Sequence, residues 1–503
     1  MANDYIEAAR AYHEITKHSY TSVRSGGHSL DWDSKPLAYK IYPETAALLL
    51  PRDLNLSAMP ALSALSSDAT AGSAAPLGLD TLTRILFCAD GLTRRKRVGN
   101  EDYHFRAAPS AGALYPIELY LAAGEVDGLE PGLYHFSPAD LKLRGLRRGD
   151  VRAILARASA HRPSIVHARA ALVLTSIFWR SAWKYRARAY RYCFWDAGTM
   201  LANLFAAASA DGIPAAAVTA FQDAPVETLL GVDSDREGVI AIVPLGSGVG
   251  EPAPPPEITP LPFESIALSE REVVYDDIVK MHRESRLVTD AEVRAVSDAV
   301  LQAPEPSASS AALKFDTVAP EDAMRLGETI LRRGSTRTFA REAIPAEELA
   351  TILAASSAHP HVDFPRLTDT YLIVNAIDGM QPGAYYYARD ARAFELLKAG
   401  DFRGEAGYLC LEQPLGMDCS ALLVYMADLE RALGALGNRG YRDAHLEAGV
   451  LGGRAYLAAY ALDRGATGLT FYDDDTTRFF EPHAAGKSPL LMVALGVPLS
   501  HTA

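Results

Sequence analysis

An internal repeat is the feature that most constrains how this chain of 503 residues can fold. The segment GLEPGLY at residues 128–134 recurs as GMQPGAY at residues 379–385, 251 positions later. Other matches at offsets of 250 or 251 are Tyr120 with Tyr371, Asp196-Ala-Gly198 with Glu447-Ala-Gly449, Phe221 with Phe471, and VPLG (243–246) with VALG (493–496). Because the matches keep one order, we expect two copies of one domain, packed as an internal pseudo-dimer.

A proline-rich stretch separates the two copies. Six of the twelve residues in 251–262 are proline, which excludes a helix or a central strand there. We therefore expect a first domain at residues 1–250, a proline-rich linker and helical connector at 251–314, and a second domain at 315–503.

Hydrophobic patterning predicts the same elements in each copy. The expected elements are helices at 82–89 and 349–355, strands at 117–122 and 371–376, short aromatic strands at 134–136 and 385–387, long helices at about 190–210 and 444–462, and closing strands at 239–245 and 490–495. Helices grouped with a mixed sheet indicate the α+β fold class.

Composition disfavours several other classes of protein. The chain carries 62 acidic against 49 basic residues, a net charge of -13, which argues against general nucleic-acid binding. The N-terminal residues lack the apolar core of a signal peptide, and the longest strongly apolar stretch, 170–179, is too short to span a membrane. The four cysteines show no CxxC pair and no metal-ligand spacing, which is typical of reduced thiols. We expect a soluble cytoplasmic protein that binds neither nucleic acid nor membrane.

Three short motifs carry candidate chemistry. RRGSTRTF at residues 332–339 offers guanidinium groups and a hydroxyl that suit a phosphate, although a solvated basic turn has the same pattern. PSAGALYP at residues 109–116 has small residues that let main-chain N–H groups approach a flat ligand, or that form an ordinary tight turn. WKYRARAYRY at residues 183–192 holds a lysine and tyrosines suited to proton transfer, or begins a basic amphipathic helix.

Together these motifs resemble the nitroreductase-like flavoprotein superfamily, and within it the SagB/ThcOx-type dehydrogenases, which are FMN-dependent azoline oxidases of peptide natural-product pathways. The likeness covers most of both copies and extends to YHEITKHS (12–19) and FYDDDTTRFFEPHAAGKSP (471–489). It implies two nitroreductase-fold domains that hold FMN at their interface. The implied cofactor-binding residues are Arg333, Ser335 and Arg337 for the phosphate and ribityl chain, Pro109, Ser110, Ala111, Gly112 and Ala113 for the flavin ring, and Gly468, Leu469 and Thr470 at the opposite edge of the ring.

The resemblance also implies a reaction. In this family a Lys-Tyr pair is tied to azoline dehydrogenation, which makes Lys184 and Tyr185 the candidate acid and base. The expected step removes a ring proton while hydride passes to flavin N5, on a thiazoline, oxazoline or similar ring. The expected partner is a peptide or small-molecule substrate, either free or bound to a carrier or leader. An NAD(P)H-dependent reductase of nitro or quinone compounds is the alternative enzyme. A non-catalytic scaffold of a modifying complex is the alternative from another class.

The repeat indicates how many cofactors to expect. Opposite the ring-lining motif the second copy has HVDFPRL (361–367), and it has Ala435-Leu436 opposite Lys184-Tyr185. Opposite the phosphate clamp the first copy offers KHSYT at residues 17–21, which lacks the last arginine. One composite site is then complete and its reciprocal site is not, so we expect one FMN per chain.

A basic run, RRKR at residues 94–97, falls in an expected loop that the second copy lacks. Such a run is either a solvated loop or a contact for an acidic leader peptide or a carrier's phosphopantetheine. Its closeness in sequence to the ring-lining motif suggests a place at the border of the site.

Overall fold

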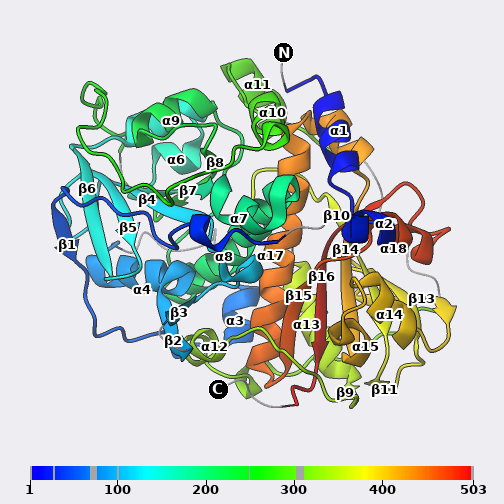
Figure 1. Ribbon diagram of the computed structural model, residues 1–503. Coiled ribbons are helices and arrows are strands. Elements are labelled where there is room, and N and C mark those ends of the chain that lie inside the picture. Colours follow the sequence, from blue (N-terminus) through cyan, green and yellow to red (C-terminus); the bar gives the residue numbers. More distant parts are fainter. Residues whose placement is uncertain are drawn as a thin grey trace.

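Two six-stranded sheets, one from each copy of the repeat, form the two halves of the molecule in the computed structural model (Figure 1). The structure describes residues 3–25, 29–67, 76–98, 101–248, 250–301, 311–358 and 360–499. In spatial order the first sheet has β1 (Ala47–Leu49), β6 (Lys142–Arg148), β5 (Gly132–Ser137), β4 (Ile117–Ala123), β7 (Ala170–Ile177) and β8 (Glu237–Leu245). The second sheet has β13 (Ala393–Ala399), β12 (Gly383–Ala388), β10 (Thr368–Val374), β14 (Ala421–Ala427), β16 (Ser488–Gly496) and β15 (Gly465–Leu469). The order from β6 to β8 matches the order from β13 to β16, which confirms the repeat and the α+β class.

The expectation of a mixed sheet is wrong. Within the described residues, every strand pairing of the two six-stranded sheets is antiparallel. The closing strands read as unbroken apolar runs because β8 is buried along its whole length and β16 is buried at every position after its first. Helices cover both faces of the sheet, and this burial produces a pattern that is more usual for parallel strands.

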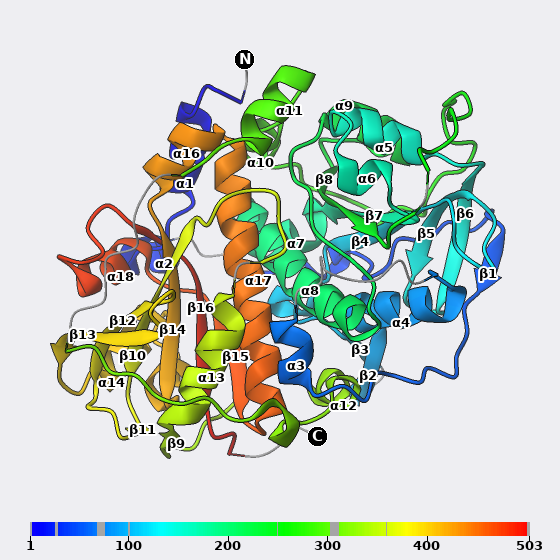
Figure 2. The same ribbon diagram turned by 180° about the vertical axis from the view of Figure 1, so that it is seen from behind.

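The two long predicted helices, α8 (Ala189–Ala210) and α17 (Arg439–Ala461), pack against each other between the sheets (Figures 1 and 2). They approach closely at the matched glycines of the repeat. A Cβ on Gly198 would lie 2.5 Å from the Leu446 carbonyl oxygen, and one on Gly449 would lie 2.6 Å from the Trp195 carbonyl oxygen. Only glycine permits this approach. One apolar core runs through both helices and into both sheets, so the domains share a single interior.

The other helices surround this core, and several of them pack on α8 or α17 while others pack on strands of the sheets. In the first domain they are α3 (Ala61–Ser66), α4 (Leu79–Asp90), α5 (Arg152–Ala158), α6 (Pro163–Val166), α7 (Phe178–Tyr185) and α9 (Asp223–Leu230). In the second they are α12 (Leu326–Arg332), α13 (Ala346–Ser357), α14 (Arg403–Leu409), α15 (Pro414–Asp418), α16 (Leu429–Leu436) and α18 (Asp473–Phe480). A second, smaller apolar cluster lies under α5, α6 and α9.

Two helical arms are exchanged between the domains. The N-terminal helix α1 (Glu7–Ile15) and α2 (Tyr20–Ser25) lie against the second domain, where Asn3 accepts a hydrogen bond from the Arg439 N–H at 2.8 Å (Figures 1 and 2). The connector carries α10 (Asp276–Glu284) and α11 (Asp290–Ser297), and α10 packs on the first domain through His282 and Tyr190. Before α10, the proline-rich stretch packs Ile258 and Leu261 on the first domain.

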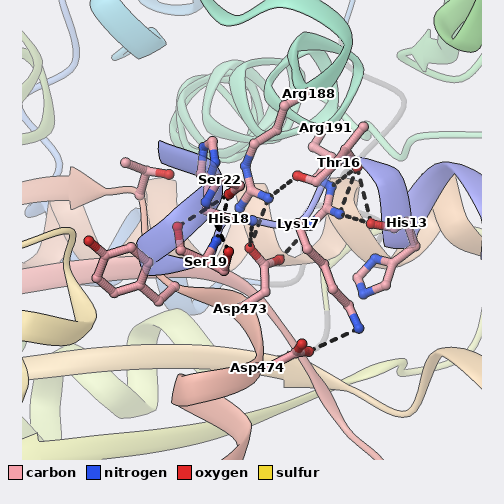
Figure 3. A network of polar contacts seen from close by, with 12 residues as sticks. His13, Thr16, Lys17, His18, Ser19, Ser22, Arg188, Arg191, Asp473 and Asp474 are labelled. Atoms are coloured by element: carbon pink, nitrogen blue, oxygen red, sulfur yellow. Dashed lines mark hydrogen bonds and ion pairs between the residues drawn. The ribbon is translucent and has the colours of Figure 1, made fainter. Parts of the chain in front are cut away.

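Matched ion clusters fasten these arms. Asp473 lies 2.9 Å from Arg188 and 2.8 Å from Arg191, and it accepts the His18 N–H at 2.8 Å (Figure 3). The repeat places the same chemistry on the other side. Asp223 pairs with Arg439 and Arg442 and accepts the Leu287 N–H at 2.8 Å. The pseudo-twofold relation therefore matches α1 with α10.

This relation corrects the expected counterpart of the phosphate clamp. Lys17 belongs to the α1 arm, where it pairs with Asp474 at 2.9 Å (Figure 3). It also pairs with Glu14 at 2.6 Å. The clamp follows α12, and the pseudo-symmetric partner of α12 is α3. At the start of these two helices the Leu326 N–H donates to the Met59 carbonyl, and the Ala61 N–H donates to the Met324 carbonyl. The true counterpart of the clamp starts at residue 68, in a segment (68–75) that lies outside the described residues. The sequence of that segment contains no arginine.

Two further observations bear on the sequence analysis. The basic run forms no loop but a hairpin of β2 (Leu92–Val98) and β3 (Glu101–Arg106), and β9 (Ile344–Pro345) pairs with β11 (Ile377–Asp378) in a second small sheet. The four cysteines are free and buried. Among the described residues, no helix combines the length and the apolar character that crossing a membrane requires.

Candidate functional site

A cavity of about 450 Å³ opens between the two domains. The structure brings all of the sequence-predicted site residues to its wall: Pro109, Ser110, Ala111, Gly112, Ala113, Lys184 and Tyr185 from the first domain, and Arg333, Ser335, Arg337, Gly468, Leu469 and Thr470 from the second. A volume of this size is typical of small-molecule and cofactor sites. The cavity exists only where the domains meet.

The loop at residues 109–113 is held in place by Asp196 of α8. The Asp196 carboxylate accepts hydrogen bonds from Ser110 Oγ at 2.6 Å and from the Ala111 N–H at 3.0 Å. Gly112 adopts a φ of +64°, and a Cβ there would stand 2.8 Å from Tyr185 Oη. A positive φ and this crowding both favour glycine. The small residues of PSAGALYP thus let the loop lie flat against the cavity.

Asp196 itself is a functional candidate that the sequence analysis named only as part of the repeat. Burial raises the pKa of Asp196 to about 7, against the opposing effect of its two hydrogen bonds. Its counterpart Glu447 accepts the Leu367 N–H at 2.9 Å in the other domain. The repeat places an acidic residue at this position in both domains, since Asp196-Ala-Gly198 matches Glu447-Ala-Gly449. This match could have indicated from the sequence that each acid holds a loop of its own domain.

Lys184 and Tyr185 stand together at the end of α7. Lys184 Nζ lies 5.3 Å from the centre of the Tyr185 ring. Burial, with a smaller contribution from Arg337, lowers the pKa of Lys184, and burial raises the pKa of Tyr185. A lysine with a lowered pKa is more readily available as a base, and a tyrosine with a raised pKa keeps its proton as a hydrogen-bond donor.

Aromatic rings wall the same end of the cavity. Tyr185 stacks on Tyr192, with ring centres 4.3 Å apart and planes 18° from parallel, and Trp195 meets Tyr192 edge-on at 4.6 Å. Tyr192 Oη donates to Thr470 Oγ1 at 3.2 Å and so reaches the second domain. The wall suits a flat, apolar ring.

The clamp begins with a buried cation, Arg333. Its guanidinium donates to the carbonyl oxygens of Ala107 at 2.9 Å, Arg106 at 2.8 Å and Gly334 at 3.3 Å. Burial lowers the pKa of Arg333, and within the described part of the chain no carboxylate neutralises it. Ser335 lies beside Tyr456, which accepts the Gly468 N–H.

The charge of the cavity wall favours an anion. Five cationic residues line it, namely Arg94, Lys96, Lys184, Arg333 and Arg337, whereas Asp196 is the single carboxylate among the described lining residues. A buried guanidinium without a carboxylate, a cationic wall and a flat aromatic face together fit a ligand with a planar ring and a phosphate. FMN is such a ligand.

Among the described residues, direct hydrogen bonds cross the pseudo-symmetric counterpart of the ring end of the cavity. Phe221 matches Phe471 at an offset of 250, which identifies residues 218–220 as the partner of 468–470, and Val218 lies against β8 as Gly468 lies against β16. There the Ala217 N–H donates to the His361 carbonyl at 2.7 Å, and Asp363 accepts the N–H groups of Thr219 at 2.8 Å and Ala220 at 3.1 Å. Asp363 occupies the position of Gly112 in the repeat, so a carboxylate bridges the gap that forms the cavity in the first site.

Comparisons with known proteins agree with this architecture. The trifolitoxin-processing protein TfxB of Rhizobium leguminosarum bv. trifolii is 30% identical over 174 residues, which is 33% of this chain and 46% of TfxB. The nitroreductase-family protein MJ1384 of Methanocaldococcus jannaschii is 29% identical over 171 residues, 34% of this chain and 81% of that protein. A solved structure of a nitroreductase-family protein from Anabaena variabilis is 28% identical, with a TM-score of 0.76, and covers 98% of this chain and 99% of its own.

One family matches the chain twice. The Nitroreductase family matches residues 73–247 and 330–497, which together make up more than half of the chain. The first match holds the ring-lining loop and the second holds the phosphate clamp. The chain is therefore an oxidoreductase of the Nitroreductase family, with two domains of that family in tandem.

Proposed function

We propose that the chain is an FMN-dependent dehydrogenase that binds one FMN in the cavity between its domains. The observation that carries the proposal is the composite wall, in which a buried, anion-seeking Arg333 and a flat aromatic face come from opposite domains. Arg333, Ser335 and Arg337 would hold the phosphate and ribityl chain. Residues 109–113 and 468–470 would line the two edges of the ring. FMN, when bound, supplies a two-electron acceptor for hydride.

A single cofactor per chain follows from the hydrogen bonds that cross the second site. Asp363 fills the position that the cavity takes in the first site, and it is hydrogen-bonded to Thr219 and Ala220 there. The segment that corresponds to the clamp has no arginine. A flavin at the second site would have to break these contacts and would meet a carboxylate where its ring should lie.

The substrate that we propose is a thiazoline or oxazoline ring in a peptide, of the class that SagB-type dehydrogenases oxidise. Similarity to TfxB, a protein named for trifolitoxin processing, supports a biosynthetic role. Loss of one proton and one hydride from neighbouring ring atoms creates the double bond of the azole. Lys184 would accept the proton at Nζ, and Tyr185 would orient the ring through its hydroxyl. The hydride would pass to FMN as the two-electron oxidant, and dioxygen or another acceptor would reoxidise the flavin.

A flavin count combined with a turnover assay tests this function. The purified chain is heat-denatured, the released flavin is measured by absorbance, and the holoenzyme is assayed on a short peptide with one thiazoline ring. We expect close to one FMN per chain and conversion to the thiazole. Two FMN per chain would contradict a single cofactor site.

Two outcomes of the same experiment favour the alternatives. Rapid bleaching of the flavin by NAD(P)H, with no thiazoline oxidation, would identify a nitro or quinone reductase. If the chain neither carries FMN nor takes it up, the remaining hypothesis would be a non-catalytic scaffold of a modifying complex.

A further inference from the structure

The β2–β3 hairpin presents two of its basic residues to the cavity. Arg94 and Lys96 are two positions apart on β2, so they project from the same face of the hairpin, and both line the cavity. Arg95 and Arg97 point to the other face, where Arg95 forms an ion pair with Asp102. The strand alternation thus divides the basic run into a cavity face and a solvent face.

The cavity face of the hairpin lies beside the phosphate clamp. The Arg333 guanidinium binds the carbonyls of Arg106 and Ala107, at the end of β3. Arg106 pairs with Leu92, and Phe105 pairs with Arg94, one step along the same ladder. The clamp helix α12 contacts β2, and the two lie side by side in Figures 1 and 2. After burial, the positive charge of Arg94 also lowers the pKa of Arg333.

The other two cations of the wall are Lys184 and Arg337. Lys184 stands beside Gly112 in the ring-lining loop and so marks the ring end, and the positive charge of Arg337 also acts on Lys184. Arg333, Arg94 and Lys96 mark the clamp end.

Three of the five N–H groups of Arg333 are already used within the protein. Nε and Nη2 donate to the first-domain carbonyls of Ala107 and Arg106, and Nη1 donates to the Gly334 carbonyl, so the guanidinium joins the clamp to the first domain and keeps two N–H groups for a phosphate. A phosphate dianion has three terminal oxygens and accepts more hydrogen bonds than these two groups provide. The hairpin supplies additional cations at this end of the wall.

We infer that Arg94 and Lys96 bind the phosphate of the flavin, together with Ser335 and Arg333, so that the phosphate is held from both domains. The inference rests on the proposed FMN site and names binding residues that the family motifs did not. No such hairpin separates α13 from β10 in the second domain, where the structure describes all but residue 359. The hairpin thus gives only one of the two pseudo-symmetric sites its extra cations.

The experiment compares FMN with riboflavin, which has the same ring and no phosphate. The flavin is removed from the full chain, and dissociation constants for both ligands are measured by quenching of flavin fluorescence. The test variant is Arg94→Gln with Lys96→Gln, and the matched control is Arg95→Gln with Arg97→Gln on the solvent face. We expect the test variant to bind FMN about 10- to 100-fold more weakly, with riboflavin affinity unchanged. The control should bind both ligands as the unchanged chain does.

Each other outcome has a distinct meaning. An unchanged FMN dissociation constant with a raised KM for an acidic peptide substrate would overturn the inference and assign the hairpin to the substrate. Equal weakening of FMN and riboflavin would also overturn it, because the effect would then not involve the phosphate. Failure of the unchanged chain to bind FMN would overturn the proposed function, and this inference with it.

Discussion

At the scale of single residues, the chemistry of the cavity depends on burial, which shifts the pKa values of two neighbouring side chains in opposite directions. Burial favours the neutral form of Lys184, and it keeps the proton on Tyr185. The positive charge of Arg337 lowers the pKa of Lys184 further. One residue is thus prepared to take a proton and the next to donate a hydrogen bond, as the proposed dehydrogenation requires.

We predict that Lys184→Ala lowers kcat on a thiazoline peptide by about 100-fold or more, while Tyr185→Phe has a smaller effect. Both variants should retain FMN, because neither side chain belongs to the clamp. The rate of the unchanged enzyme should rise with pH through a pKa below the ordinary lysine value, and Lys184→Ala should lose that rise. Lys280→Ala, on the exposed face of α10, is the control. Full turnover by Lys184→Ala would remove it from the mechanism.

At the scale of secondary-structure elements, the helix pair α8 and α17 sets the spacing of the whole site. Asp196 and Tyr192 project from α8 into the cavity, and Tyr456 does so from α17. The close approach at Gly198 and Gly449 brings these side chains within reach of one ligand. The packing of two helices thus controls the geometry of the cavity several residues away.

Adding one methyl group at this crossing should disturb both stability and cofactor binding. We predict that Gly198→Ala lowers the free energy of unfolding by about 2 kcal/mol, because the new Cβ would overlap main-chain atoms of α17. Gly434→Ala in α16 meets no atom within 4 Å and should gain about 0.5–1 kcal/mol from helix propensity. Thermal unfolding measures both. Equal melting temperatures for the two variants would show that the crossing tolerates a side chain.

At the scale of the whole molecule, two buried carboxylates fasten the domains in a pseudo-symmetric manner. Burial by itself would raise the pKa of Asp473, but Arg188 and Arg191 hold it below its ordinary value. Arg439 and Arg442 have the same effect on the pKa of Asp223. A lowered carboxylate pKa stabilises the fold above about pH 4, and this contribution is lost as the pH falls through the folded-state value.

We predict that Asp473→Asn lowers the free energy of unfolding by about 3–5 kcal/mol at pH 7, since two buried guanidiniums lose their carboxylate. The difference from the unchanged chain should shrink below about pH 4, where Asp473 becomes protonated in the unfolded state. The neighbouring exposed pair gives the control, because Asp474→Asn removes a surface ion pair worth about 0–1 kcal/mol. A difference between the two variants that does not depend on pH would contradict the electrostatic explanation.

Much of the site was predictable because its motifs are continuous in sequence. Two short segments carry most of it: Gly112 with the small residues around it, and the arginines that follow α12. Each segment suits its role through its own local sequence, and both line the cavity. The long helices and the strands β4, β5, β8, β10, β12 and β16 were also predicted within a few residues, because their apolar patterns are local. The basic run was misjudged as a loop because exposed charges hid the alternation of a hairpin.

The sequence by itself determined the repeat, the tandem nitroreductase domains and the residues around which a site would form. The tertiary structure alone decided which segments meet. It matched α1 with α10 rather than with the clamp helix, and it filled the second site with Asp363. It also turned the hairpin toward the clamp and used Arg333 to join the domains. These outcomes depend on contacts between residues more than sixty positions apart, and the geometry of such contacts arises only when the two domains pack around one core.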